Sequence, residues 1–239
     1  MDQALLAQTQ CYFGGGTRIV LELGEYRESK DIDFLCASRD GYRLLRETVS
    51  HESLGPMFRK PVPLAREVRT DQYGIRTFLD LKASKLKFEI VREARIELEG
   101  QNIASLPVPC LTRQHAFAEK FLANTDRGLD ASTLSRDMID LAFMIEGWAT
   151  ADAAAGLAIA KTAYGEAVER SIEAVARKMR EDRSYRNRCI EGLAITEPKI
   201  LVAGLETIIG KKWAALPPIK ANIQAPQTAP KVVKSRRSG

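Results

Sequence analysis

The feature that most constrains the fold is a glycine turn followed at short spacing by two alternating acids. Gly14-Gly15-Gly16-Thr17 precedes Asp31-Ile32-Asp33, and Asp31 lies fourteen positions after Thr17. A glycine turn that opens a short helix can bind phosphate, because free backbone N–H groups point outward there. Side chains two residues apart on a strand share a face, so the two acids can hold one divalent cation. The order predicts a strand–turn–helix–strand unit with a site for a nucleoside triphosphate and its magnesium ion.

Alternating apolar and polar residues in the first half of the chain predict a mixed α/β region. The expected strands are Cys11–Phe13, Lys30–Cys36, Val62–Val68, Arg76–Leu81 and Lys85–Val91, with Arg92–Leu98 as an extension of the sheet. Apolar residues at helical spacing predict short helices over Thr17–Leu23 and Gly41–Val49. The first half is therefore expected to form a sheet with flanking helices.

The prolines of Leu106–Pro109 interrupt this pattern, and the chain that follows is expected to be helical. Thr112 is predicted to cap a helix that ends at Asn124, and Ser135 a helix that ends at Trp148. Further helices are expected at Asp152–Tyr164, Gly165–Asp182 and Pro198–Ile209. The predicted fold class is α+β, with a mixed sheet and flanking helices in an α/β domain at 1–108, a helical domain at 109–213 and a disordered Pro/Ala-rich basic tail at 214–239.

Composition narrows the class of protein. The chain is 45% hydrophobic and 28% charged, which is typical of a soluble globular protein. It has no apolar run long enough to span a membrane and no signal peptide at its start, so we expect no membrane partner and a cytoplasmic location. Four scattered cysteines indicate neither zinc nor a disulfide framework. Most of the net charge of +5 comes from the basic tail, which we expect to be solvated rather than to bind RNA.

Nucleotidyl transfer requires a bound triphosphate, neutralised charge and an attacking oxygen in line with the leaving pyrophosphate. A third carboxylate on a neighbouring strand would complete the metal site; Glu89 is the best candidate, and Asp80 is its competitor. With three carboxylates, two magnesium ions could be bound; with two, one. On the phosphate side the candidate ligands are Gly15, Gly16, Thr17, Arg27 and Ser29.

Two blocks of the sequence resemble a known family. Phe13–Thr17 and Arg27–Phe34 match a signature of Gly-Gly-Thr followed by Arg-x-Ser-x-Asp-hydrophobic-Asp. Past the proline break, Ala118–Lys120, Arg127 and Arg136–Leu141 resemble a later block with a lysine, an arginine and then Arg/Lys-Asp-x-x-Asp-Leu. The family is the AbiEii/AbiGii toxin nucleotidyltransferases of the DNA-polymerase-β-like superfamily. The resemblance covers residues 10–145, and it departs from many members at Glu25, where they have a basic residue or histidine.

The resemblance implies roles for individual residues. Asp31 and Asp33 would be magnesium ligands, and Gly15, Gly16 and Thr17 would form the phosphate turn. Lys120 would contact the triphosphate, and Asp137 would be a further functional acid that orients this lysine or a basic partner. Without the resemblance, Asp137 is typical of a first helical turn stabilised by the helix dipole, and Lys120 of an ordinary surface lysine.

These observations predict an enzyme that moves a nucleotide from an NTP to an acceptor hydroxyl, with Mg²⁺ as cofactor. The resemblance implies a bacterial toxin–antitoxin or phage-defence toxin with a cognate antitoxin, and acceptors such as the 3′ end of tRNA or a protein. One alternative is a non-catalytic protein of the same fold that binds an NTP or a partner. The other is a small-molecule nucleotidyltransferase of the aminoglycoside-inactivating type.

Overall fold

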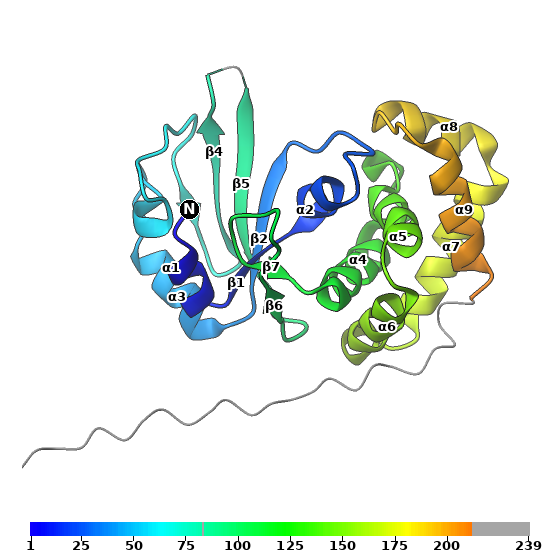
Figure 1. The fold of residues 1–239 in the computed structure, drawn as a ribbon, viewed down its shortest axis with the longest axis horizontal. Helices are drawn as coiled ribbons and strands as arrows, with labels where there is room; N and C mark the ends of the chain where they lie inside the picture. Colours follow the sequence, from blue (N-terminus) through cyan, green and yellow to red (C-terminus); the bar gives the residue numbers. More distant parts are fainter. Residues whose placement is uncertain (83, 212–239) are drawn as a thin grey trace, which may run out of the picture.

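The computed structural model describes residues 1–82 and 84–211, and within them a mixed seven-stranded sheet lies beside a group of helices (Figure 1). The strand order across the sheet is β3-β4-β5-β2-β1-β7-β6. The bounds of the strands are β1 Cys11–Gly14, β2 Asp31–Cys36, β3 Arg69–Thr70, β4 Gly74–Asp80, β5 Lys85–Arg92, β6 Gly100–Gln101 and β7 Cys110–Leu111. The predicted acidic pair therefore begins the middle strand of the sheet.

Strand register fixes which side chains share a face around the acidic pair. β2 is antiparallel to β1 and parallel to β5. In the parallel pair, Asp31 lies opposite Lys87 and Asp33 lies opposite Glu89. Since side chains alternate along a strand, these four residues project from the same face of the sheet.

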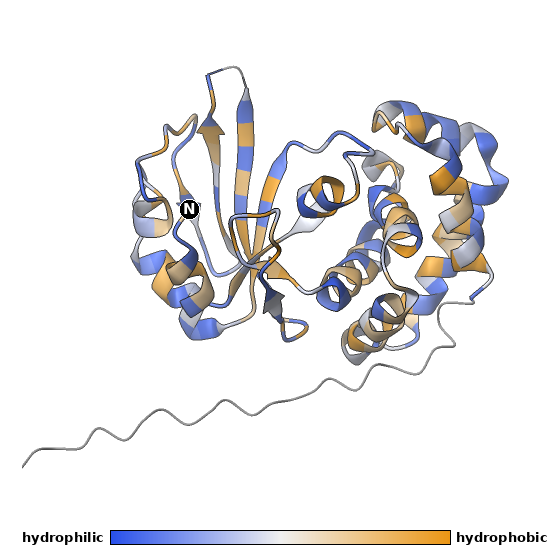
Figure 2. Ribbon diagram, in the orientation of Figure 1, coloured by the Kyte–Doolittle hydropathy of each residue, from blue (hydrophilic) through white to orange (hydrophobic). Residues whose placement is uncertain are grey.

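Each face of the sheet is covered by its own apolar core. On one face, α1 (Gln3–Gln8) and α3 (Arg39–Glu47) cover a core that includes Phe34, Phe88 and Ile90. On the other face, Leu35 packs into a core that also holds Ile19 of α2 (Gly15–Glu22) and the apolar sides of the later helices. Figure 2 shows the apolar sides of these helices turned toward one another. The acidic pair is on this second face.

The later helices form a group on the side of the sheet that carries α2 (Figure 1). Their bounds are α4 Arg113–Arg127, α5 Arg136–Gly147, α6 Thr150–Tyr164, α7 Ala167–Glu181, α8 Arg183–Gly192 and α9 Pro198–Ile209, with 3-10 turns at Gly55–Met57 and Ala131–Thr133. Thr112 caps α4 as predicted, because its hydroxyl accepts a hydrogen bond from the N–H of His115. None of the helices in the described part is long and apolar enough to cross a membrane.

The predicted cap at Ser135 is wrong, although the helix it was expected to begin is present. Ser135 has a left-handed backbone conformation and makes no side-chain cap. Its hydroxyl instead donates to the carbonyl oxygen of Gly128 and pairs with the hydroxyl of Tyr185 on α8. Ser135 therefore joins the start of α5 to two neighbouring segments.

Two predicted strands are absent. Val62–Val68 forms only an isolated bridge, between Leu64 and Leu79, because the prolines on either side of Val62 have no N–H to donate to a ladder. The extension over Arg92–Leu98 is also wrong beyond Arg92. There Glu93 accepts hydrogen bonds from the backbone and side chain of Arg95, which turns the chain away from the sheet.

Among the helices and strands of the described residues, five were not predicted from the sequence: α1, α8 and the short strands β3, β6 and β7. β7 pairs in parallel with β1, with Cys110 opposite Phe13, so the sheet continues two residues beyond the predicted boundary at 108/109. The division into an α/β domain and a helical domain stays a prediction. The predicted tail at 214–239 lies outside the described residues.

Candidate active site

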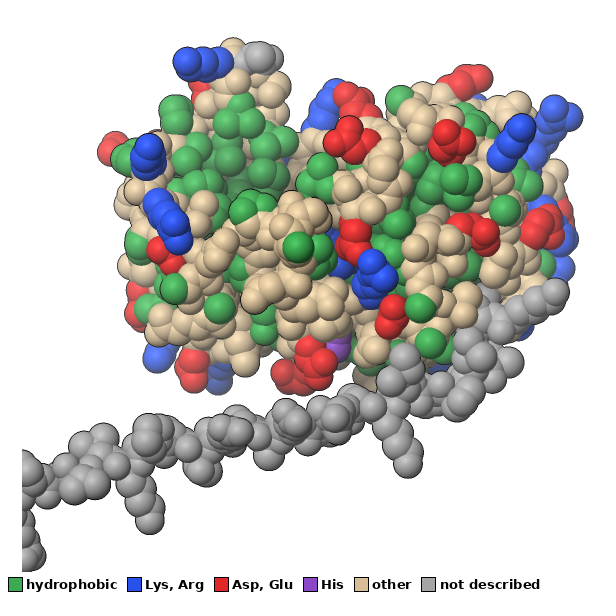
Figure 3. Space-filling model, in the orientation of Figure 1, with side chains coloured by type: hydrophobic (Ala, Val, Ile, Leu, Met, Phe, Trp, Pro, Cys, Tyr) green, Lys and Arg blue, Asp and Glu red, His purple; other side chains and the backbone are tan. Residues whose placement is uncertain are grey.

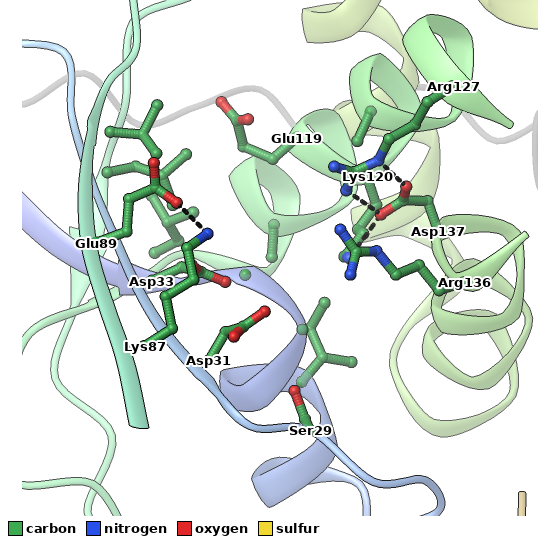
Figure 4. Close-up of a pocket in the computed structure, with 18 of the residues that line it drawn as sticks. Ser29, Asp31, Asp33, Lys87, Glu89, Glu119, Lys120, Arg127, Arg136 and Asp137 are labelled. Atoms are coloured by element: carbon green, nitrogen blue, oxygen red, sulfur yellow. Dashed lines mark hydrogen bonds and ion pairs between the residues drawn. The ribbon is translucent and has the colours of Figure 1, made fainter. Parts of the chain in front are cut away.

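A cavity of about 400 Å³ opens between the sheet and the helices, which is the size of a small-molecule site. Figure 4 shows two walls facing one another across it. The strand wall consists of side chains from β2 and β5, namely Asp31, Asp33, Lys87 and Glu89. The helix wall consists of side chains from α4 and α5, namely Lys120, Arg127, Arg136 and Asp137.

The glycine turn packs directly beneath these residues. Gly15 has a φ of +66°, which L side chains rarely adopt, and a Cβ on it would lie 2.4 Å from an oxygen of Asp33. A Cβ on Gly16 would lie 2.2 Å from Nη2 of Arg27. Both glycines line the cavity. Glycine is therefore required at both positions for the backbone to approach the site residues this closely.

Thr17 holds the glycine turn to the start of β2. Its hydroxyl is 2.7 Å from the hydroxyl of Ser29 and donates a hydrogen bond to the backbone carbonyl of Asp31. Ser29 lines the cavity beside the acidic pair, whereas Thr17 is not among the lining residues. The structure thus places Thr17 behind the predicted phosphate turn, where it positions Ser29 and Asp31.

The carboxylates of Asp31 and Asp33 have no hydrogen-bond or ion-pair partner among residues 1–82 and 84–211. Burial, and then the charge of Asp31, raise the pKa of Asp33 above its ordinary value. Two adjacent carboxylates, one of them costly to ionise in its surroundings, are a donor set that a divalent cation would stabilise. The residues present at this position therefore fit a magnesium ion.

The two candidates for a third metal ligand, Glu89 and Asp80, differ from Asp31 and Asp33 in their surroundings. Glu89 lies beside Asp33, but its two oxygens are paired, one with Nε of Arg76 at 2.5 Å and the other with Nζ of Lys87 at 2.6 Å. Asp80 is exposed at the end of β4 and does not line the cavity. Within the described chain, no three His, Cys, Asp or Glu side chains are grouped to hold a metal ion.

On the helix wall, Asp137 is bound by two cations. Its carboxylate accepts from Lys120 Nζ at 2.8 Å and from Arg127 Nε and Nη2 at 2.7 and 3.1 Å. Although burial opposes ionisation, Lys120 and Arg127 hold the pKa of Asp137 well below its ordinary value. Asp137 thus orients Lys120, which is one of the roles that the family resemblance implied for it.

Lys120 and Arg27 meet at a second buried acid. Asp140 accepts from Lys120 Nζ at 2.6 Å, from Arg27 Nε and Nη2 at 2.7 and 2.9 Å, and from the hydroxyl of Tyr26 at 2.6 Å. Burial lowers the pKa of Lys120, but Asp137 and Asp140 outweigh it and raise the pKa above its ordinary value. Arg27, a predicted triphosphate ligand, lines the cavity while bound to Asp140. This network ties the loop before β2 to α5.

Arg136 is a further cation of the helix wall that the sequence reasoning did not select. It lines the cavity and, within residues 1–82 and 84–211, has neither a hydrogen bond nor an ion pair. The other lysines and arginines that line the cavity each have a carboxylate partner: Arg27, Lys30, Lys87, Arg95, Lys120 and Arg127. The only signal for Arg136 in the sequence is its position before Asp137 in the later block.

The face of the molecule drawn in Figure 3 carries charges of both signs. On the face drawn in Figure 3, acidic and basic side chains are interspersed over both the sheet and the helices. No large area of one sign is visible on that face.

The comparisons with known proteins agree with this geometry. The family model of the AbiEii toxin, a nucleotidyl transferase of type IV toxin–antitoxin systems, matches residues 3–188, which is well over half of the chain. No significant match was found among curated proteins.

Two crystal structures from Helicobacter pylori are similar in fold. A nucleotidyltransferase candidate has a TM-score of 0.52 and 18% identity, covering 87% of this chain and 90% of its own. The protein JHP933 has a TM-score of 0.51 and 17% identity, covering 87% of this chain and 88% of its own. At this identity they show the fold alone, and they confirm the predicted α+β arrangement.

Proposed function

Because the chain belongs to the AbiEii nucleotidyl transferase toxin family of type IV toxin–antitoxin systems, we propose that it transfers a nucleotide from an NTP to an acceptor hydroxyl with magnesium held by Asp31 and Asp33. The acceptor that we propose is the 3′ end of tRNA. The family implies an NTP as substrate and a cognate antitoxin as partner.

The observation that carries the proposal is the pair of carboxylates beside the glycine turn, Asp31 and Asp33, which have no partner among the residues that the structure describes. A magnesium ion bound there would neutralise charge on the triphosphate and polarise the bond to be broken. Gly15 and Gly16 let the backbone lie close to phosphate oxygens, and the N-terminus of α2 favours an anion. The acidic pair then faces the part of the cavity where a phosphate chain would lie.

Two cations of the helix wall support binding of the triphosphate. Arg136 has no carboxylate partner in the described chain, so its planar guanidinium can pair with two phosphate oxygens. Lys120 has three N–H donors, of which Asp137 and Asp140 each accept one. Its remaining donor is available to a phosphate oxygen, which is the role that the family resemblance implies for it, while the two acids fix its position. Thr17 supports the site from behind, whereas Arg27 lines the cavity with its guanidinium bound to Asp140.

The test is to incubate the purified full chain with magnesium and each of the four α-³²P-labelled NTPs, with and without total tRNA. We expect label in the tRNA with at least one NTP. Label in protein alone would replace tRNA as the acceptor, and label that depends on an added aminoglycoside would favour the small-molecule alternative. NTP binding by calorimetry without transfer to any of these acceptors would favour the non-catalytic alternative.

Two substitutions make the test specific to the site. Asp31→Asn and Asp33→Asn should abolish label transfer while leaving the fold intact. Glu47→Gln, an exposed residue of α3 on the other face of the sheet, is the matched loss of one negative charge and should transfer at the wild-type rate. Undiminished transfer by both aspartate variants would contradict the metal assignment.

A further inference from the structure

Lys87 and Glu89 are placed in the site by the same register that places the acidic pair. β2 and β5 are parallel, with Asp31 opposite Lys87 and Asp33 opposite Glu89. The four side chains therefore form a square on one face of the sheet, with three acids and one lysine. In Figure 4 the amine of Lys87 points to Glu89, next to the two aspartates.

The two oxygens of Glu89 are already paired. Arg76 of β4 approaches one oxygen, and Lys87 approaches the other. Arg76 is itself held by Asp71 at 3.0 Å, so its position is fixed from two sides. The side chain of Glu89 is only 13% exposed, which limits any alternative rotamer. To bind a divalent ion, Glu89 would have to release Arg76 or Lys87, because each of its two oxygens is already paired with one of these cations.

We propose that the strand wall holds a single divalent ion, on Asp31 and Asp33, and that Glu89 keeps the Lys87 ammonium beside them as a fixed monovalent cation. This inference rests on the proposed function, because it concerns the same site. It assigns Glu89 as a positioning residue instead of a third metal ligand.

Lys87 supplies charge and hydrogen-bond donors where a second divalent ion would otherwise lie. An ammonium carries three donors, of which Glu89 accepts one, so the others can reach an oxygen of the transferred phosphate or of the acceptor. Its charge favours the negative charge that develops on those oxygens during transfer. Glu89 and Arg76 have the supporting task of holding the stem of Lys87 in place.

The experiment counts manganese ions bound to the full chain. Mn²⁺ replaces Mg²⁺ and is measured by electron paramagnetic resonance, with the chain alone and with an NTP analogue whose α,β bridge cannot be cleaved. We expect one bound ion per chain in both conditions. Asp33→Asn should weaken manganese binding at least ~10-fold, because a direct ligand is lost.

The decisive variant is the charge-neutral double substitution K87M/E89Q. If the charges of Lys87 and Glu89 neutralise each other, as we propose, this variant still binds one manganese ion, with an affinity within ~3-fold of the wild type. The matched control is R43M/E47Q, which removes an exposed Arg–Glu pair on α3 and should leave binding unchanged. Circular dichroism of each variant shows whether the fold is retained.

Measurements of kcat distinguish a role of Lys87 in nucleotide transfer from a purely structural role. Lys87→Met should lower kcat for nucleotide transfer while the ion count stays at one, and Lys87→Arg should restore part of it. Two manganese ions per wild-type chain, or a loss of binding of ~10-fold or more in K87M/E89Q, would overturn the inference.

The inference and the proposed function fail in different ways. The absence of bound manganese under both conditions would remove the metal assignment of Asp31 and Asp33, and the inference with it. A chain that transfers nucleotide and binds two ions would keep the proposed function and reject the single-ion site. An unchanged kcat in Lys87→Met would reject the role of the ammonium.

Discussion

The two walls of the cavity both carry buried or half-buried aspartates, but the aspartates of the two walls differ in their ion pairing and in the direction of their pKa shifts. On the strand wall, Asp31 and Asp33 have no partner within the described residues, and burial and mutual repulsion raise the pKa of Asp33. On the helix wall, Asp137 and Asp140 are saturated by cations, which lower the pKa of both carboxyls despite their burial. One wall keeps negative charge available for a ligand, and the other uses it to hold the fold together.

The comparison also shows how the two walls depend on each other. Asp140 binds Arg27, which belongs to the loop that leads into β2, and it binds Lys120 of α4. The helix wall thereby fixes the approach of the chain to the acidic pair. A strongly perturbed carboxyl in a cleft, such as that of Asp33, is typical of a functional site.

The largest effect is expected from removing charge on the strand wall. Asp31→Asn or Asp33→Asn should lower the rate of nucleotide transfer by at least ~10³-fold, because the ion that stabilises the triphosphate loses a ligand. Stability should not fall: the folded-state pKa of Asp33 is raised, so its ionised form opposes folding above its ordinary pKa, and Asn relieves this at neutral pH. Initial rates and urea unfolding at pH 7 measure the two effects. An Asp33→Asn variant that transfers nucleotide at the wild-type rate would contradict the inference that the strand wall keeps its carboxylates available for a ligand.

On the helix wall, in contrast, removing a carboxylate is expected to lower the stability of the fold. Asp140→Asn should reduce the free energy of unfolding by about 3–5 kcal/mol, because it leaves the buried charges of Arg27 and Lys120 without compensation. Urea unfolding at pH 7 measures the loss. Asp40→Asn, at an exposed position of α3, is the control and should stay within about 0.5 kcal/mol of the wild type. If both variants were equally stable, the buried network would not hold the walls together.

Local sequence patterns predicted the strand wall well, because its residues are close in the chain. The glycine turn, the acidic pair and the strand with Glu89 were all placed correctly relative to one another by alternation and spacing. What the patterns could not show was the pairing of Glu89, since Arg76 and Lys87 reach it through the register of three strands. A lysine two residues before an acid is equally typical of an exposed strand face.

The helix wall was less accessible to sequence reasoning because its contacts are long-range. Asp140 is separated from Arg27 by 113 positions, and no local pattern signals that pair. Lys120 was selected only through the family resemblance, and its burial at 7% exposure runs against the usual behaviour of a lysine. The wrong strand at Val62–Val68 has a different cause, because the prolines on either side of Val62 have no N–H groups to donate to a ladder.

The contribution of Asp137 on the helix wall should be measurable in the pH dependence of stability. The folded-state pKa of Asp137 is lowered, so its contribution to stability is present above its ordinary pKa near ~4 and is lost as the pH falls through the folded value. Below pH ~4 the slope of the unfolding free energy should be shallower in Asp137→Asn, by up to ~1.4 kcal/mol per pH unit. Urea unfolding at several pH values between ~2 and ~5 checks this. Identical slopes would mean that Asp137 titrates alike in the folded and unfolded chain.

The smallest effect is expected from the turn that supports the strand wall. Gly15 and Gly24 both have a positive φ, so alanine at either should cost about 1–2 kcal/mol of stability. They differ in space, because a Cβ on Gly15 would meet Asp33, whereas a Cβ on Gly24 meets nothing within 4 Å. Gly15→Ala should therefore displace Asp33 and lower nucleotide transfer ~10-fold or more, while Gly24→Ala keeps the wild-type rate at similar stability. Since backbone strain is common to both variants, a difference in rate isolates the contact with Asp33. Equal rates would show that the turn tolerates a methyl group beneath the acidic pair, and that its glycines serve the backbone conformation alone.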